Sequence, residues 1–472
     1  MTGLHHAEPV RAVQEALAGV ANAWLVGGVV RDSLLGRELT DVDIAVSGDP
    51  AEAARAVGVA LKGPVFALSE AFGAWRAIDR DRRFTCDVSP LQGRTIQDDL
   101  ARRDFSVNAM AAPLAGGELI DPHGGAADLA GRRLRVLGAG TYDADPLRAL
   151  RAVRLAAELG LELDPETERL TRAAAPRLSE PSPERLFAEL RRLVTAPGAL
   201  AGLELAARLE VLGAILPELT ALTGIEQSPF HHLDVFDHTL EVLRRLMELE
   251  LDLPSVFADL APDVAGALSE PLADEMTRGQ ALRLAALLHD VAKPATRGVR
   301  ADGRVTFVGH DSAGDEMAGE IFRRLRTSER LRSYVGKLTR EHLALGFLVH
   351  EMPLPRRRVH GFLRQCEPVE VEVIVLSCAD RMATRGDGQE PWIASHLELA
   401  REMMAAALEW RANGPPGPLL RGDDLARELG IAPGPEIGLL LGRLEEAVYA
   451  GEASSRDDAL ALARRLRQNQ RR

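Results

Sequence analysis

Two aspartates separated by one residue, Asp41 and Asp43, begin the segment DVDIAV. Side chains two residues apart on a strand point to the same face of a sheet, so the two carboxylates should lie side by side. Such a pair repels, and Mg²⁺ bound through one or two carboxylates and substrate phosphates relieves the repulsion. This arrangement favours in-line attack of a hydroxyl on a phosphate. A bare pair of this kind is more often a charged turn, so further motifs are needed.

A glycine turn and another carboxylate come from neighbouring segments. Gly27 and Gly28 follow the apolar run AWLV and open a predicted helix, where backbone N–H groups can hold a phosphate. Asp87, in the predicted strand FTCDVSP, is a candidate third carboxylate of the same sheet.

Further along, Asp145, Arg148, Arg151 and Arg154 recur at intervals of three, a spacing that predicts a row winding slowly round a helix. Arg148 and the preceding Asp145 are neighbours in this row. Arginine offers only donors and ionised aspartate only acceptors. Arg148 could donate to N3 and O2 of cytosine while Asp145 accepts from its N4 amine, and the same pair could read N1 and N6 of adenine. Uracil and guanine present the opposite pattern. Taken alone, the row is more often a solvated arginine face.

Four ordered motifs resemble the class II CCA-adding enzyme and bacterial poly(A) polymerase family. GGVVRDSLLG followed by DVD is similar to its signature, and DDLARRDFSVNAMA to its RRD motif, in which Arg and Asp hold the triphosphate and ribose. DPHGGAADLAGRRLRVLG resembles the end of its head domain, and ADPLRALRAVRLAAELGLELDPET its nucleotide-selecting motif. The resemblance implies template-independent addition of nucleotides to the 3′ end of RNA. The expected partner is the tRNA 3′ end, with CTP as substrate and ATP as a second candidate.

The resemblance also assigns site residues. Asp41 and Asp43 would be catalytic and would hold Mg²⁺. The nucleotide-binding residues would be Gly27, Gly28, Arg31, Asp32, Arg102, Arg103, Asp104, Asn108, Asp145, Arg148, Arg151 and Arg154.

The sequence departs from the family pattern in two places. The selecting motif usually has Glu before the Asp, where this chain has Ala144, so that Arg148 would be oriented less firmly. Members that add CCA usually carry a longer flexible loop where this chain has VSPLQGRTIQDDLA. The short stretch resembles members that add only CC, so we expect addition of C, with the final A in question.

The second half of the chain holds histidine and aspartate in an ordered series. His289 and Asp290 close the apolar helical run ALRLAALL, and a buried charged pair needs partners or a metal. Nitrogen and carboxylate ligands from separate helices suit a transition-metal ion. The series resembles the HD phosphohydrolase family, which implies a divalent metal held by His238, His289, Asp290 and Asp380, with His310 and His342 as candidates for a second metal or for phosphate contacts.

The predicted elements that carry the candidate site residues indicate an α+β head followed by helical parts. We expect a polymerase-β-like head, a mixed sheet with helices, over 1–140. Its strands are AWLVGG, DVDIAV, FTCDVSP and RRLRVLG, and its helices lie near 8–20, 50–60 and 98–112. An all-α neck with the selecting and RNA-binding motif is expected over 141–225, an HD-type helical domain over 226–410, and a helical tail over 411–472 after a proline- and glycine-rich linker.

Composition is consistent with this organisation. A net charge of −13 argues against a generally basic RNA-coating protein, although local arginine clusters remain available for phosphates. No apolar run is long enough for a membrane span, and three widely spaced cysteines form no disulfide framework. We therefore expect a cytoplasmic protein without a membrane partner; composition does not indicate its oligomeric state.

Two alternatives stay open. One is a poly(A) polymerase or A-adding member of the same family, which would keep the motifs named above. The other is an HD phosphohydrolase whose head only binds RNA. Loss of the Asp41 and Asp43 pair would have supported that second alternative, and the pair is present.

Overall fold

Six short strands in the first 113 residues pair into one mixed sheet. The computed structural model describes residues 4–20, 22–69, 73–227, 233–384 and 390–470. The strands run in the order β3-β4-β5-β2-β1-β6, with β2 and β5 parallel and the other neighbours antiparallel. Their bounds are β1 Ala23–Val26, β2 Asp41–Val46, β3 Val65–Ser69, β4 Ala74–Ile78, β5 Thr85–Pro90 and β6 Ala111–Pro113.

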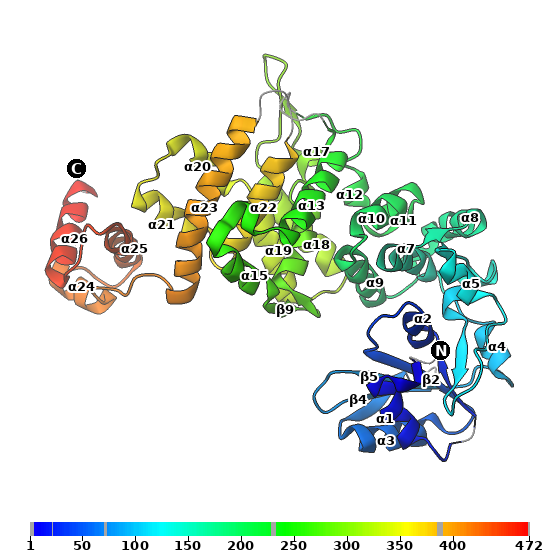
Figure 1. Cartoon of the computed structure of the whole chain (residues 1–472). Coiled ribbons are helices and arrows are strands. Elements are labelled where there is room, and N and C mark those ends of the chain that lie inside the picture. The colour runs from blue at the N-terminus through cyan, green and yellow to red at the C-terminus, as the bar shows by residue number, and fades with distance from the viewer. Residues whose placement is uncertain (1–3, 21, 70–72, 228–232, 385–389, 471–472) are drawn as a thin grey trace. The chain divides into compact units, whose positions relative to one another are not determined.

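The two faces of this sheet have different roles. Alternation along β2 sends Val42 into an apolar core under α1 (Glu8–Ala16) and α3 (Pro50–Leu61). Figure 1 shows both helices beside the labelled strands. Asp41 and Asp43 lie on the opposite face, which is therefore the face available for chemistry.

The chain divides into two compact units, Met1–Ile215 and Leu216–Arg472. In the first unit, helix α7 packs against α9 and α10. The remaining α-helices and strands of this unit are α2 Gly28–Leu34, α4 Ile96–Leu100, α5 Gly125–Ala130, β7 Arg133–Leu134, α6 Gly140–Ala144, α7 Arg148–Leu159, β8 Glu162–Leu163, α8 Pro165–Ala174, α9 Pro183–Thr195, α10 Ala199–Arg208 and α11 Val211–Ile215.

Within its described residues, the second unit is helical apart from two small hairpins (Figure 1). Its helices are α12 Pro217–Thr220, α13 Val235–Leu251, α14 Pro254–Phe257, α15 Ala261–Ser269, α16 Arg278–Leu288, α17 Lys293–Thr296, α18 His310–Arg324, α19 Glu329–Glu341, α20 Ala344–Leu348, α21 Arg356–Cys366, α22 Glu370–Ala383 and α23 Glu390–Asn413. The hairpins are β9 Pro271–Ala273 with β10 Met276–Thr277, and β11 Gly298–Val299 with β12 Val305–Thr306. After the irregular residues 414–421, the helices α24 Gly422–Leu429, α25 Pro435–Ala450 and α26 Arg456–Gln470 share a core of their own.

The expected fold class, a mixed sheet with helices followed by helical parts, is confirmed. The helix expected near 98–112 is wrong: α4 ends at Leu100 and a strand begins at Ala111. The Asp104 carboxylate accepts from the amide of Phe105 at 2.8 Å, and Phe105 bridges to Val136, so the backbone has partners other than a helical turn. The strand expected from RRLRVLG shrinks to β7. The boundaries at 140, 225 and 410 stay predictions.

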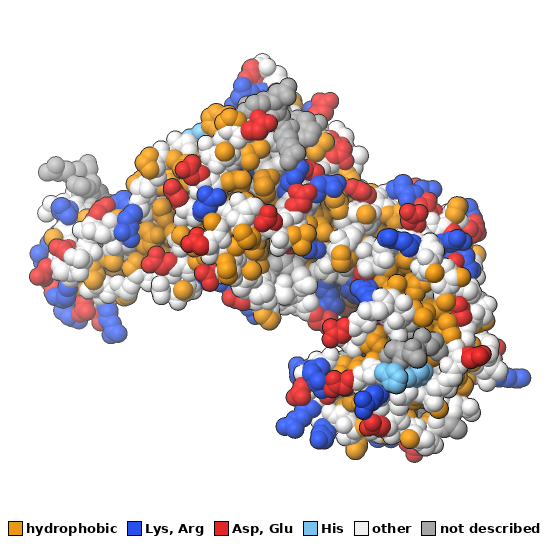
Figure 2. All heavy atoms as spheres, in the orientation of Figure 1, with side chains coloured by type: hydrophobic (Ala, Val, Ile, Leu, Met, Phe, Trp, Pro, Cys, Tyr) orange, Lys and Arg blue, Asp and Glu red, His pale blue; other side chains and the backbone are white. Residues whose placement is uncertain are grey.

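The structure also shows the distribution of surface charge, the character of the helices and the state of the cysteines. Over the face seen in Figure 2, basic and acidic side chains are interspersed. In the described part of the chain, none of the helices combines the length and the apolarity that crossing a membrane requires. All three cysteines are buried and free.

Candidate active sites

Asp41, Asp43 and Asp87 lie close together on one sheet face. The parallel pairing of β2 with β5 places Asp43 directly opposite Asp87 and Asp41 opposite Thr85. Asp43 is partly buried, and this burial, together with the Asp87 carboxylate and then Asp41, raises its pKa to about 6. A divalent cation offsets negative charge concentrated in this way, so this donor set fits Mg²⁺.

Asp87 differs from the other two carboxylates because it already has a cationic partner. Arg76 lies opposite it on β4 and donates from Nε and Nη2 to the two carboxylate oxygens, at 2.7 and 2.8 Å. By contrast, Asp41 accepts only from hydroxyls, Thr85 at 2.8 Å and Thr40 at 3.2 Å, among the described contacts. Arg76 was not predicted from the sequence, since only the β4–β5 register brings it to Asp87.

The turn at Gly27 and Gly28 packs beside the Asp43 carboxylate. Gly27, with φ +67°, precedes α2, and a Cβ there would lie 2.6 Å from Nη1 of Arg103. A Cβ on Gly28 would lie 3.5 Å from Oδ2 of Asp43. The Gly27 amide donates to the Met110 carbonyl at 3.1 Å, so what glycine provides at this position is conformation and close approach.

A chain of hydrogen bonds links five of the predicted nucleotide-binding residues, Arg31, Asp32, Asn108, Asp104 and Arg151. Arg31 donates to both oxygens of Asp32, at 3.0 and 2.8 Å, and to Oδ1 of Asn108 at 2.5 Å. Asn108 donates to Oδ1 of Asp104 at 2.9 Å, and Oδ2 of Asp104 accepts from Arg151 at 3.1 Å. Burial opposes ionisation of Asp104, but Arg151 and Asn108 hold its pKa below the ordinary value.

The chain of hydrogen bonds continues between α7 and α9 through Glu189, which was not predicted from the sequence. Glu189 accepts from Arg151 at 2.8 Å and from Arg154 at 2.5 Å. Arg154 also donates to Glu158, and its side chain is only 5% exposed. Arg151 and Arg154 therefore hold α9 against α7 through Glu189. Neither composition nor spacing singles out Glu189.

Asp145 lies just before α7, in extended backbone with φ −157° and ψ 101°. The prediction that it belongs to the helical row is wrong, because the following Pro146 disfavours helical geometry in the residue before it. Asp145 and Arg148 nevertheless stay adjacent, since the Arg148 amide donates to the Asp145 carbonyl at 3.1 Å.

Both side chains of this pair have further partners. The guanidinium of Arg148 donates to the backbone carbonyls of Thr141 and Arg102, each at 3.3 Å. Oδ2 of Asp145 accepts from Nη2 of Arg185, on α9, at 2.6 Å. Arg102 itself is exposed.

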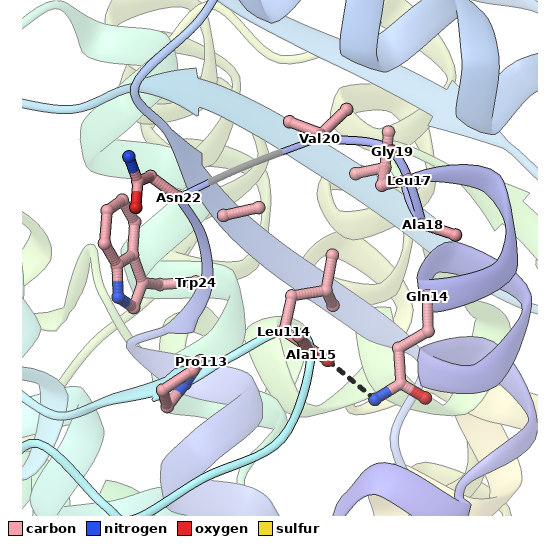
Figure 3. A pocket seen from close by; sticks show the side chains of 11 residues that line it. Gln14, Leu17, Ala18, Gly19, Val20, Asn22, Trp24, Pro113, Leu114 and Ala115 are labelled. Carbon is pink, nitrogen blue, oxygen red and sulfur yellow. Dashed lines mark hydrogen bonds between the residues drawn. The ribbon is translucent and has the colours of Figure 1, made fainter.

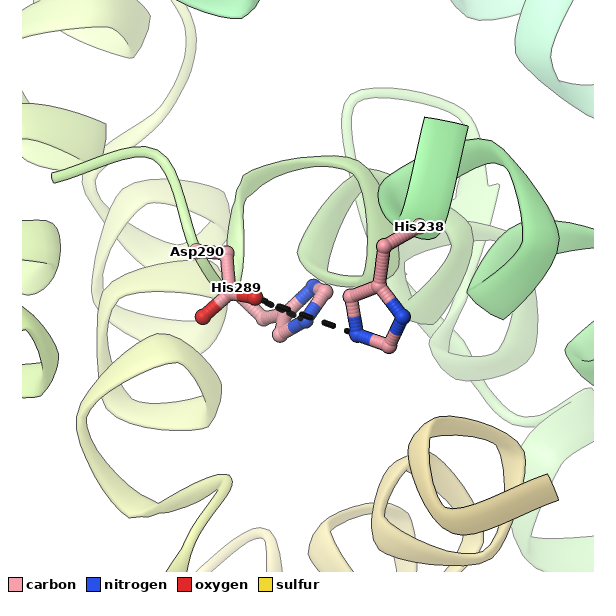
Figure 4. A group of neighbouring side chains, drawn as sticks. All are labelled: His238, His289 and Asp290. Carbon is pink, nitrogen blue, oxygen red and sulfur yellow. Dashed lines mark ion pairs between the residues drawn. The ribbon is translucent and has the colours of Figure 1, made fainter. Parts of the chain in front are cut away.

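In the second unit, all six predicted metal ligands converge. Figure 4 shows His238, His289 and Asp290 pointing toward one another. Asp290 lies at the centre: its Oδ2 is 3.1 Å from Nε2 of His289, and its Oδ1 is 3.2 Å from Nε2 of His310. Asp380 lies 3.0 Å from Nε2 of His238. Asp290, His310 and His342 form a second group of suitable ligand atoms.

The histidine rings are oriented as metal ligands usually are. Nδ1 of His289, His310 and His342 faces the carbonyl of Ala286, Phe307 and Thr339 at 2.8, 2.7 and 2.6 Å, respectively. A carbonyl only accepts, so Nδ1 must donate and the Nε2 lone pair turns inward. Burial and then His289 lower the pKa of His342 to about 4, which keeps it neutral. Nε2 of His310 and Nε2 of His342 lie 3.3 Å apart. Facing lone pairs of this kind fit a bound transition-metal ion.

This cluster opens into a cavity of about 540 Å³. Two basic side chains, Lys293 and Arg381, line it together with Phe307 and Phe347. Lys293 lies 2.6 Å from Oδ2 of Asp290. Cations beside a metal centre suit a phosphate-containing substrate.

Another hollow, of about 740 Å³, lies at the end of β1 remote from Gly27 (Figure 3). Gln14 donates there to the Leu114 carbonyl at 2.8 Å. Its lining, within the described residues, contains no acidic, basic or histidine side chain. This hollow therefore has no group suited to acid–base or metal chemistry.

Three parts of the sequence match known families. Residues 23–135 match the poly A polymerase head domain, residues 160–223 the probable RNA and SrmB-binding site of polymerase A, and residues 235–385 the HD domain. The Thermotoga maritima CCA-adding enzyme complexed with tRNA has a similar fold, with a TM-score of 0.59 at 23% identity over 96% of this chain and 93% of that one.

Curated relatives match along nearly the whole chain. The A-adding tRNA nucleotidyltransferase of Deinococcus radiodurans is 36% identical, covering 94% of this chain and 95% of its own. The CC-adding tRNA nucleotidyltransferase of Thermus thermophilus is 35% identical, covering 93% of each. The multifunctional CCA protein of Xanthomonas campestris is 33% identical, covering 94% and 99%. With these relatives and its polymerase head, the chain belongs to the tRNA nucleotidyltransferase family and is a nucleotidyltransferase that carries an HD domain.

Proposed function

We propose that this enzyme adds cytidylate from CTP to the 3′ end of tRNA, and that it adds the terminal A poorly. The observation that supports poor addition of A after C is the connection between β5 and α4, which comprises only residues 91–95. Family members that complete CCA usually have a longer flexible loop here, and a moving lid needs chain length.

This connection is also tied down. The backbone amides of Arg94 and Thr95 both donate to Oδ2 of Asp98, at 2.9 and 3.0 Å. The amide of Gln92 donates to Oδ1 of Asp99 at 3.0 Å. A lid motion of this connection would have to break these bonds.

The residues of the head would divide the work. Asp41 and Asp43 would hold Mg²⁺, which when bound neutralises charge on the attacking and leaving oxygens. Arg148 would donate to N3 and O2 of cytosine, and Asp145 would accept from N4. The remaining predicted residues, from Arg31 to Arg154, would hold the triphosphate or support the residues that do.

Addition of A is the second candidate. The A-adding and CC-adding relatives are almost equally similar to this chain, at 36% and 35% identity. The test is incorporation of each single nucleotide into tRNA ending at the discriminator base, at C and at CC. Incorporation of ATP alone into the CC-ending tRNA, without CTP use on the shorter ones, would favour this second candidate.

We propose a separate phosphomonoesterase or phosphodiesterase activity for the HD centre. His238, His289, Asp290 and Asp380 would bind one divalent transition metal, and His310 and His342 a second one that shares Asp290. The inward-facing Nε2 atoms support this proposal. Metal analysis of the purified enzyme, followed by assay of phosphate release from nucleoside monophosphates and cyclic phosphates, tests it.

A further inference from the structure

We propose that Arg185, on α9, is a positioning residue for base selection: it fixes the carboxylate of Asp145 that accepts the amine of the incoming base. This inference rests on the proposed role of Asp145 and Arg148 as the base-reading pair. It adds a residue from a different helix, which none of the motifs identified.

The carboxylate of Asp145 is held at both oxygens. Oδ2 accepts from Nη2 of Arg185 at 2.6 Å, and Oδ1 accepts from the amide of Leu147 at 3.3 Å. The Asp145 side chain remains 21% exposed, and that of Arg185 is 50% exposed. The acceptor is therefore fixed in direction and still reachable by a ligand.

Such a brace matters more in this chain because Arg148 is held weakly. Ala144 occupies the position where the family usually has Glu, and a methyl group cannot accept a hydrogen bond. Arg148 donates to two backbone carbonyls at the long distance of 3.3 Å, and its Nε is buried with no partner among the described residues. The hydrogen bond from Arg185 to Asp145 is shorter, at 2.6 Å, and joins two charged groups, so it is the stronger restraint on the base-reading pair.

A fixed carboxylate discriminates by geometry. Cytosine offers its N4 amine to Asp145 while N3 and O2 face Arg148. Uracil has a carbonyl in place of that amine, so it can satisfy the carboxylate only by sliding until its N3–H reaches it. A carboxylate that is free to turn would follow this slide, whereas one braced by Arg185 would leave a polar group unpaired.

The experiment compares kcat/KM for CTP and UTP on tRNA that ends at the discriminator base. Arg185→Ala should lower the CTP to UTP ratio about tenfold. Arg185→Lys, which keeps the charge, should recover part of the ratio. The kcat for CTP should change much less than the ratio, because the proposed role touches the base edge and not the phosphates.

Arg177→Ala is the matched control. Arg177 pairs with Asp143, two residues before Asp145, at 3.0 Å and with Glu180 at 2.8 Å, and its side chain is 38% exposed. Its loss should leave the ratio unchanged. Both ion pairs are exposed enough that neither variant should alter thermal unfolding appreciably.

A double-mutant cycle with Asp145→Asn separates positioning from a general structural effect. If Arg185 acts through Asp145, Arg185→Ala should cause no further loss of selectivity in that background. Equal losses in both backgrounds, or an unchanged ratio in the single variant, would overturn the inference. A wild-type enzyme that does not prefer CTP, or an Asp145→Asn variant that keeps the preference, would instead overturn the proposed function. For an A-adding enzyme, the same cycle is run with ATP and GTP on tRNA ending in CC.

Discussion

Asp43 and Asp87 face each other across two parallel strands, and Asp87 is paired with Arg76 while the pKa of Asp43 is raised to about 6. The two carboxylates therefore differ in what they can do. Asp87 is held as a counterion, whereas Asp43 retains charge that favours a cation.

Without metal, Asp43→Asn should stabilise the fold at pH 7.5. The pKa of Asp43 is raised from 3.8 to about 6 in the folded state, chiefly by burial. Stability associated with its protonated form is thus present below the unfolded pKa and lost as pH rises through about 6. The gain at pH 7.5 should be on the order of 3 kcal/mol. Denaturation in EDTA at pH 7.5 and 5 measures it, and the gain should shrink at the lower pH. An equal gain at both values would contradict the electrostatic explanation.

Replacing both Asp41 and Asp43 with Ala should abolish nucleotide addition and leave the fold intact. The two side chains share one sheet face and are the proposed Mg²⁺ ligands. Single-turnover incorporation of CTP checks the loss, with circular dichroism as the check of folding. Activity within about tenfold of wild type would show that the transfer chemistry lies elsewhere.

Arg148→Ala should relax base choice more than it slows transfer. Its guanidinium is proposed to read the base, and a lost charged hydrogen bond costs on the order of 1.5–3 kcal/mol in discrimination. The measurement is the ratio of CTP to UTP incorporation. An unchanged ratio in a folded variant means that this arginine does not act as the template.

The HD centre should be separable from the head. His289→Ala combined with Asp290→Ala should remove the bound metal and any phosphatase or cyclic phosphodiesterase activity, because Asp290 lies between the two groups of histidines. Addition of CTP should be largely unaffected. Metal analysis, phosphate release and CTP incorporation are measured on the same preparation. Loss of all three would indicate a metal that supports the whole fold.

Sequence could predict the elements whose pattern is local. The alternation in DVDIAV and the apolar run before Gly27 correspond to β2 and β1, and ALRLAALL corresponds to the buried helix that ends at His289. The histidines converge as expected, because burying a charged pair requires partners.

Long-range partners could not be predicted in this way. Arg76 reaches Asp87 only through strand register, and Glu189 and Arg185 reach α7 and Asp145 only through helix packing. The three-residue spacing predicted Asp145 to be helical, and this prediction is wrong because the following Pro146 favours an extended backbone at that residue. Period and composition carry no information about such contacts between distant segments.

The last prediction concerns the terminal A. We expect the enzyme to add C readily to tRNA and to add A to CC-ending tRNA slowly or not at all. After two cytidines are added, the same pair, Asp145 and Arg148, must present itself differently to fit a purine. In members of the family that complete CCA, this change is associated with a flexible loop. Here residues 91–95 are the whole connection between β5 and α4. The side chains of Asp98 and Asp99 accept hydrogen bonds from three of its backbone amides.

Ala144 stands where the family usually has Glu, so this chain lacks a carboxylate that could hold Arg148 in the orientation that fits a purine. The measurement is a single-turnover assay on CC-ending tRNA with ATP alone, beside CTP addition to the tRNA ending at the discriminator base. The two substrates are used with one enzyme preparation, so that the CTP reaction controls for active-enzyme concentration. If A is added at a rate comparable to C, the length of this connection does not limit the switch and the enzyme completes CCA. If only A is added, the base-reading pair is set for adenine from the start, and the similarity to the A-adding relative extends to its reaction.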